Sequence, residues 1–114
     1  MLDHYILDEN KNAVRVQHNE LIEWMKKNRN RHVGHETVDG YRVSTVFLTV
    51  DHNHWGGSPI LFETMIFDAS GDPALNYQER CSTWEQAEKM HKDAVAYVER
   101  QNSINPTKHN PAGE

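Results

Sequence analysis

The feature that most constrains the fold is an apolar stripe along a predicted C-terminal helix. Ser82 and Glu85 form a capping box that opens this helix, and the helical pattern continues to about Arg100. At 100° per residue, one side of the helix presents Trp84, Ala87, His91, Ala94, Val95 and Val98. Strands predicted over 41–50 and 59–67 have apolar side chains on both faces, as central strands covered on each side do. We therefore expect a sheet with the C-terminal helix packed across one face.

Turn and cap signals predict the remaining elements. Residues 5–16 form a hairpin around a polar turn, and Asn19 caps a helix over residues 20–28. Asp39-Gly40 suits a two-residue turn, which joins a strand over 32–38 to the strand over 41–50. The resulting order β-β-α-β-β-β-α predicts an α+β domain with a mostly antiparallel sheet and two helices.

The chain of 114 residues is long enough for one core but not for two. We expect a single domain over residues 1–101 and a flexible C-terminal tail over 102–114, where Pro106, Pro111 and Gly113 disfavour regular structure.

Charge and hydropathy exclude several classes of partner. Lys and Arg number 12 and Asp and Glu number 17, so the formal net charge is −5 and binding to nucleic acid is disfavoured. The longest apolar run, residues 94–98, is far shorter than the roughly 20 residues of a membrane-spanning helix. The N-terminus lacks the basic and apolar regions of a secretion signal, and a single cysteine allows no intrachain disulfide. We expect a cytoplasmic protein without a membrane partner.

One segment departs from the acidic average. Residues 26–32, KKNRNRH, place four cations within six residues. Cations at a helix C-terminus are stabilised by the helix dipole, and this is the interpretation we favour. The same segment is alternatively a contact for an anionic ligand or an acidic partner.

His91 stands at the centre of the helix stripe. A buried polar group without a partner costs about 1–3 kcal/mol, so the imidazole needs a hydrogen bond or a metal. We favour a core histidine bonded to a backbone carbonyl or a strand hydroxyl over a functional one.

Glu63 raises a similar question on the strand over 59–67. Its same-face neighbours on an ideal strand are Leu61, Met65 and Phe67. A carboxylate buried there needs a partner, and the candidates are His91, Arg80 and Arg42. A pair between Glu63 and His91 would form a general acid/base unit, whereas a solvent-facing Glu63 or a structural ion pair would have no catalytic role.

The loop between the two central strands contains Asp51, His52 and His54. One oxygen and two nitrogens make a partial site for a divalent metal, which His91 or Glu63 would complete. The plainer interpretation is that these histidines are solvated.

The same loop offers a second kind of site. Gly56 and Gly57 would let backbone N–H groups approach a phosphate, and Trp55 would stack on a base. An ordinary glycine-closed loop is the alternative.

Cys81 directly precedes the predicted helix start. The positive end of the helix dipole would lower the pKa of a thiol there and favour a nucleophile. No catalytic motif surrounds Cys81, so a partly buried structural thiol is the better interpretation.

Three segments resemble a group of small uncharacterised bacteriophage and prophage proteins. They are RVSTVFLTVDH over residues 42–52, GGSPILFETM over 56–65, and YQER with TWEQA and His91 over 77–91. The resemblance covers about residues 41–98. It implies an accessory protein that acts inside an infected bacterium, either by blocking a host protein or by binding or destroying a small host signal.

Three functional hypotheses follow. In the first, a pocket between the 51–58 loop, the strand of Glu63 and the helix of His91 binds or sequesters a small anionic, nucleotide-like ligand. Its ligand-binding residues would be His52, Trp55, Gly56, Gly57, Arg80 and Arg42.

In the second hypothesis the protein is a metal-assisted hydrolase. Asp51, His52 and His91 hold a metal or position water, and Glu63 acts as the base. In the third, the protein is an inhibitor that binds a host protein and has no small-molecule site.

Overall fold

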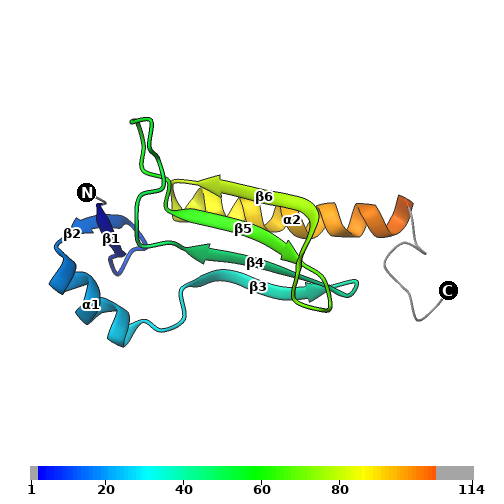
Figure 1. Cartoon of the computed structure of the whole chain (residues 1–114), viewed down its shortest axis with the longest axis horizontal. Coiled ribbons are helices and arrows are strands. Elements are labelled where there is room, and N and C mark those ends of the chain that lie inside the picture. The colour runs from blue at the N-terminus through cyan, green and yellow to red at the C-terminus, as the bar shows by residue number, and fades with distance from the viewer. Residues whose placement is uncertain (1–2, 105–114) are drawn as a thin grey trace.

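The computed structural model describes residues 3–104 and arranges them as two helices and six strands (Figure 1). The elements are β1 (His4–Leu7), β2 (Ala13–Val16), α1 (His18–Lys27), β3 (His32–Val38), β4 (Tyr41–Phe47), β5 (Phe62–Phe67), β6 (Pro73–Cys81) and α2 (Trp84–Ile104). Strands β3 to β6 form an antiparallel sheet in chain order, and β1 pairs with β2 in a separate hairpin. The α+β class and the C-terminal helix across the sheet are confirmed.

The sheet has a strand, β6, beyond those predicted from the sequence. It follows the predicted loop and pairs along β5, with Glu63 opposite Arg80. Helix α2 extends through residues 102–104, which the sequence predicts as the start of the flexible tail. The rest of the predicted tail, 105–114, lies outside the described residues.

The core lies between α2 and one face of the sheet. On β4 and β5 every second side chain is buried on this face: Val43, Thr45, Phe47, Phe62, Thr64 and Ile66. The helix contributes Ala87, His91, Ala94 and Val98, all from the predicted stripe. Two apolar clusters result, one around Val43 and Ile66 and one around Phe47 and Phe62, and the polar layer of Thr45, Thr64 and His91 lies between them.

Element ends differ from the predictions by a few residues. Helix α2 is capped by Thr83 rather than Ser82, because the Thr83 hydroxyl accepts from the N–H of Gln86 and the Gln86 side chain accepts from the N–H of Thr83. Helix α1 is capped by Gln17 with Glu20, not by Asn19. Strand β4 ends at Phe47, and the chain then meets β1 through a bridge between Val50 and His4.

The β1–β2 hairpin is attached at the end of the sheet. The N–H of Tyr5 donates to the carbonyl of Thr49 over 2.7 Å, and the N–H of Asp51 donates to the carbonyl of Asp3 over 3.2 Å. Leu7 of the hairpin and Trp24 of α1 pack against the cluster around Phe47. The hairpin and α1 therefore cover one end of the core (Figure 1). Within residues 3–104, neither helix is long and apolar enough to cross a membrane.

Candidate functional site

His91 is held in the core by hydrogen bonds at both ring nitrogens. Its Nδ1 lies 2.7 Å from the hydroxyl of Thr45, which is itself 2.5 Å from the hydroxyl of Thr64. Its Nε2 lies 2.8 Å from Oε1 of Glu36 on β3. The ring also covers Gly34, where a Cβ would lie only 2.6 Å away. His91 is therefore a core histidine bonded to a strand hydroxyl, with a carboxylate partner that the sequence did not predict.

The Thr45–His91–Glu36 chain has the order of a nucleophile, a base and an orienting acid. Thr45 is 0% exposed and His91 is 7% exposed, so no substrate atom can reach the hydroxyl. The arrangement satisfies the hydrogen-bonding groups of buried polar side chains in the core.

Glu63 lies on the opposite face of the sheet from His91. Its neighbour Thr64 points toward α2, and successive side chains of a strand alternate between faces. The Glu63 carboxylate accepts from Gln78 Nε2 over 2.6 Å and from Arg80 Nε over 3.0 Å. Of its three candidate partners the structure selects Arg80, and the acid/base pair of Glu63 with His91 does not form.

The other predicted arginine is also engaged on the sheet. The guanidinium of Arg42 lies 4.7 Å from the ring centroid of Phe67. Neither Arg42 nor Arg80 lines any of the three cavities described below.

Asp51 and Asn53 stabilise the loop after β4. One oxygen of Asp51 accepts from the N–H of Asn53 over 2.7 Å and from that of Ile60 over 2.9 Å. The Asn53 side chain bridges the loop, because it donates to the carbonyls of Gly56 over 2.6 Å and Ser58 over 2.8 Å. Asp51 is thus used as a structural acceptor at the base of the loop.

The weak metal candidates Asp51, His52, His54 and His91 are not brought together. Across residues 3–104, no three His, Cys, Asp or Glu side chains are placed to hold one metal ion. The hydrolase set fails for the same reason, since His91 lies between α2 and the sheet and Glu63 lies on the other side of the sheet.

The tip of this loop points into solvent (Figure 1). Trp55 is 95% exposed, and Gly56 and Gly57 adopt φ of +85° and +91°, which side chains rarely allow. None of the cavities described here includes a residue of the 51–58 loop. None of the three cavities therefore lies at the predicted position between this loop, β5 and α2.

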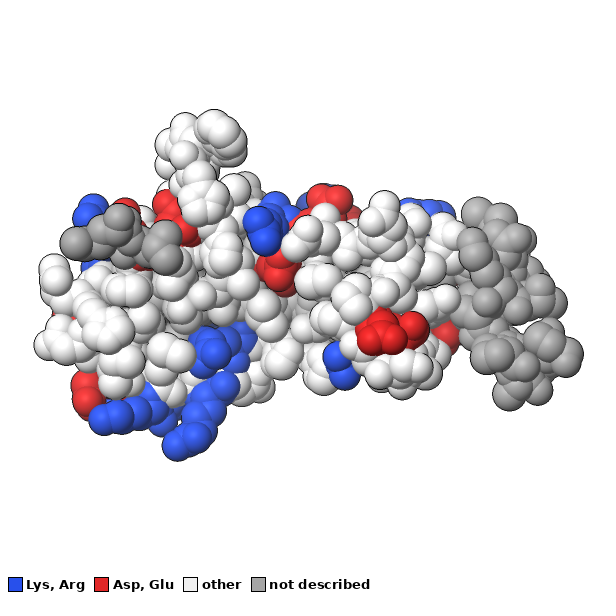
Figure 2. Space-filling view, in the orientation of Figure 1, with Lys and Arg blue, Asp and Glu red and all other residues white. Residues whose placement is uncertain are grey.

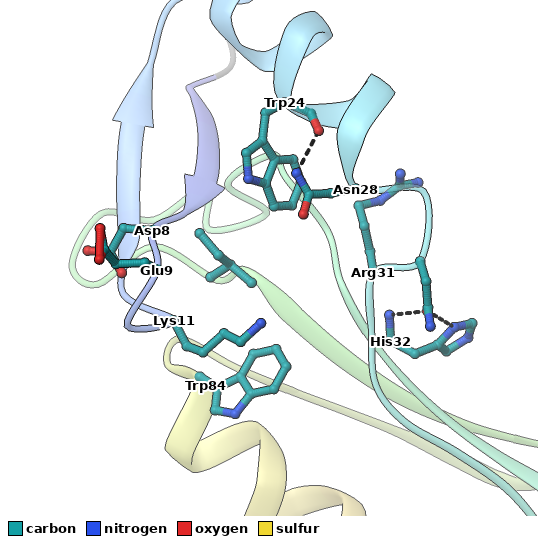
Figure 3. Close-up of a pocket in the computed structure, with 10 residues that line it drawn as sticks. Asp8, Glu9, Lys11, Trp24, Asn28, Arg31, His32 and Trp84 are labelled. Carbon is teal, nitrogen blue, oxygen red and sulfur yellow. Dashed lines mark hydrogen bonds between the residues drawn. The ribbon is translucent and has the colours of Figure 1, made fainter.

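A cavity of about 330 Å³ lies between the β1–β2 turn, the segment joining α1 to β3, and the start of α2 (Figure 3). We name it the hairpin cavity. It is lined by Leu7, Asp8, Glu9, Lys11, Trp24, Asn28, Asn30, Arg31, His32 and Trp84. Its volume is at the lower end of the range usual for small-molecule sites, about 300–1,000 Å³.

Two cations of the hairpin cavity are not neutralised. Lys11 Nζ lies 4.9 Å from the ring centroid of Trp84, and neither Lys11 nor Arg31 forms an ion pair with another described residue. Asp8 is engaged in the turn, where its Oδ1 accepts from the N–H groups of Asn10 and Asn12 over 2.8 and 2.9 Å. Figure 3 shows the carboxylates of Asp8 and Glu9 on the outer side of the turn, away from the amine of Lys11.

His32 is oriented by its neighbour. Its Nδ1 and its backbone N–H both lie 3.0 Å from Oδ1 of Asn30. Burial lowers the pKa of the imidazole from its ordinary value, and His35 and the nearby arginines act in the same direction. The free protein therefore favours a neutral imidazole at this wall of the cavity.

Cys81 is half-buried at the end of β6, and its thiol donates to the carbonyl of Thr83 over 3.7 Å. Burial raises the pKa of this thiol, which opposes thiolate formation. The geometry suits a structural thiol.

Sequence reasoning missed the hairpin cavity but noted one of its walls. Arg31 and His32 belong to the basic segment 26–32, for which contact with an anionic ligand was the second interpretation. No local pattern links that segment with Lys11 and Trp84, which fold against it from distant parts of the chain.

Comparisons with protein-family models, with curated proteins and with solved structures found no match to this chain.

Proposed function

We propose that the protein binds a small anionic, nucleotide-like ligand in the hairpin cavity. The observation that supports this most directly is the pair of unneutralised cations, Lys11 and Arg31, in one cavity with Trp24 and Trp84. A phosphate needs charged donors, and an aromatic base needs a flat apolar surface on which to stack. The cavity offers both.

Binding would rearrange Lys11. In the free protein its amine lies over the ring of Trp84, a contact worth about 0.5–1 kcal/mol at an exposed site. A base that stacks on Trp84 displaces the amine, which then turns to the phosphate. Because the charge-assisted bond to phosphate is the stronger contact, the exchange favours the bound state.

A second cavity shows why charge matters more than volume. It has about 360 Å³ and lies between α2 and β6, but its cation Lys89 is already paired with Asp93 over 2.9 Å. Glu79 adds another negative charge there. An anion would be repelled from this cavity, so we place the ligand in the hairpin cavity.

The resemblance to phage and prophage proteins adds a setting to this proposal. The ligand would be a nucleotide of the host cytoplasm, and the protein would act by sequestering it. This role requires tight binding and no turnover.

One observation favours a second candidate, a protein partner. Trp55 stands 95% exposed on a loop that Asn53 and Asp51 hold in shape. Tryptophan is enriched among the residues that dominate protein interfaces, and a preformed loop loses little entropy on binding. This candidate does not involve the hairpin cavity, so substitutions distinguish the two.

The test is a calorimetric titration of the purified chain with adenosine, guanosine, cytidine and uridine monophosphates. We expect at least one nucleotide to bind, and Lys11→Ala and Arg31→Ala to weaken that binding about tenfold each. Lys92→Ala is the matched control, because Lys92 is an exposed lysine of α2 outside the cavity. Absence of binding, or equal affinity of the Lys11 and Lys92 variants, would contradict the proposal.

A further inference from the structure

The hairpin cavity has a neighbour. A cavity of about 280 Å³ is lined by Arg29, Arg31, His32, Val46, Phe47 and Leu48, and we name it the linker cavity. Arg31 and His32 line both cavities, so the segment that joins α1 to β3 forms part of the wall of each. The backbone N–H of Phe47 donates to the carbonyl of Arg31 over 2.9 Å, which ties this segment to the end of β4.

Both cavities combine cations with apolar side chains. The linker cavity has an apolar floor from Val46 and Leu48, and Arg29 adds a further cation. Arg29 forms no ion pair with any residue between 3 and 104. Figure 2 shows the Lys and Arg side chains of residues 26–31 gathered at the end of α1 and beside the start of β3. The hairpin cavity thus offers tryptophan rings and the linker cavity offers aliphatic side chains against which a ring can pack, and Arg31 lines both.

We infer that the two cavities together bind a ligand with two nucleotide units joined by phosphate. This inference rests on the proposed function and extends it from one nucleotide to two. One ring occupies the hairpin cavity against Trp84, and the second lies on the apolar floor of the linker cavity. The linking phosphate meets Arg31, which lines both cavities, and Arg29 contacts the second nucleotide unit. A free dinucleotide and the end of a single-stranded oligonucleotide present this same chemistry.

The charges of the protein favour a short ligand. Contacts to phosphates supply most of the affinity of a protein for a long nucleic-acid strand. The chain has a formal net charge of −5, so its surface outside the two cavities opposes further phosphates. The carboxylates of Asp8 and Glu9 lie on the outer side of the β1–β2 turn, where they would repel phosphates that extend beyond the hairpin cavity. The site therefore accommodates two units and not a continuous strand.

For each of the four bases, the experiment compares the nucleoside monophosphate, the 5′-phosphorylated homodinucleotide and the homo-octanucleotide on the intact chain by calorimetry. We expect the dinucleotide to bind about tenfold more tightly than the mononucleotide, since a second charge-assisted contact forms. The octanucleotide should bind no more tightly than the dinucleotide. Arg29→Ala should abolish the tenfold gain and leave mononucleotide affinity unchanged, while Lys92→Ala should change neither.

Each other outcome has a distinct meaning. If the mononucleotide binds and the dinucleotide binds no better, the two-unit ligand is excluded while the proposed function stands. If the octanucleotide binds far more tightly than the dinucleotide, the restriction to two units is wrong. If no probe of any base binds, the proposed function itself is overturned, and this inference with it.

Discussion

The imidazole of His91 occupies the space that a side chain on Gly34 would need, because a Cβ at position 34 would lie 2.6 Å from the ring. Gly34→Ala should therefore push the ring away from Thr45 and Glu36. Overpacking of this kind costs about 1–3 kcal/mol of folding free energy, and we expect that loss in urea unfolding.

A double-mutant cycle provides the control for Gly34. His91→Ala removes the ring and creates the space that a methyl group at position 34 needs, so Gly34→Ala should cost much less in that background. Equal costs in both backgrounds would show that the ring is not the cause.

His91→Gln should lower stability without affecting nucleotide binding. The substitution disturbs the hydrogen bonds to Thr45 and Glu36, and such losses cost about 1–3 kcal/mol when a buried group is left unsatisfied. His91 does not line the hairpin cavity, so the calorimetric affinity of the folded variant should equal that of the parent. A weakened affinity at unchanged stability would reverse this assignment and make His91 a ligand contact.

Substitution of two tryptophans should affect nucleotide binding differently. Trp84→Ala should weaken nucleotide binding about tenfold, because stacking on an aromatic side chain contributes about 1–3 kcal/mol per base. Trp55→Ala should leave both the affinity and the melting temperature unchanged, since this side chain is 95% exposed and outside the cavity. Loss of binding in the Trp55 variant alone would show that the nucleotide binds at the 51–58 loop and not in the hairpin cavity.

Nucleotide affinity should rise as the pH falls through the range in which His32 takes up a proton. Burial lowers the pKa of this imidazole from 6.5, so the unfolded chain takes up its proton first and the free protein loses stability as the pH falls below about 6.5. A bound phosphate favours the imidazolium, so binding takes up a proton and strengthens as the pH falls from about 8 to about 6. Calorimetry in two buffers of different ionisation enthalpy measures this uptake.

His32→Asn is the control for that measurement. A phosphate monoester has its own pKa near 6, and its titration contributes to the profile of both proteins. The part of the proton uptake that disappears in the variant belongs to His32. An identical uptake in both proteins would rule His32 out.

Cys81 should react slowly with alkylating reagents. Burial raises the pKa of its thiol, and the thiolate is the reactive form. At about pH 8 the native chain should be alkylated several-fold more slowly than the chain in denaturant, as mass spectrometry can follow. A native rate equal to or above the denatured rate would support the nucleophile hypothesis instead.

The sequence predicts elements well where a periodic pattern meets a turn or cap. The buried side of α2 and the Asp39-Gly40 turn were both evident. Strand β6 was not, because it is an edge strand with mostly polar exposed residues and an irregular start, where Leu75 and Asn76 adopt φ of +60° and +50°. Its pairing with β5 shifts register between Met65 and Phe67, so no simple alternation marks it.

Side-chain partners were predictable only as sets of alternatives. Arg80 was one of three partners proposed for Glu63, and choosing it requires the register that places the two residues opposite each other. Glu36 and Thr45 could not be assigned to His91, since they are 55 and 46 residues away in the chain. The hairpin cavity depends on tertiary contacts of the same kind.

The attachment of the β1–β2 hairpin at the end of the sheet has a consequence for motion. Its two strands pair with each other, and outside that pair the bridge from His4 to Val50 and the bonds near Tyr5 and Asp51 join it to the segment after β4. Such a unit can detach in a local opening that costs less free energy than global unfolding. Lys11 and Leu7 would leave the cavity wall with the hairpin. Amide exchange in the hairpin would therefore measure the fraction of molecules in which the hairpin cavity is formed.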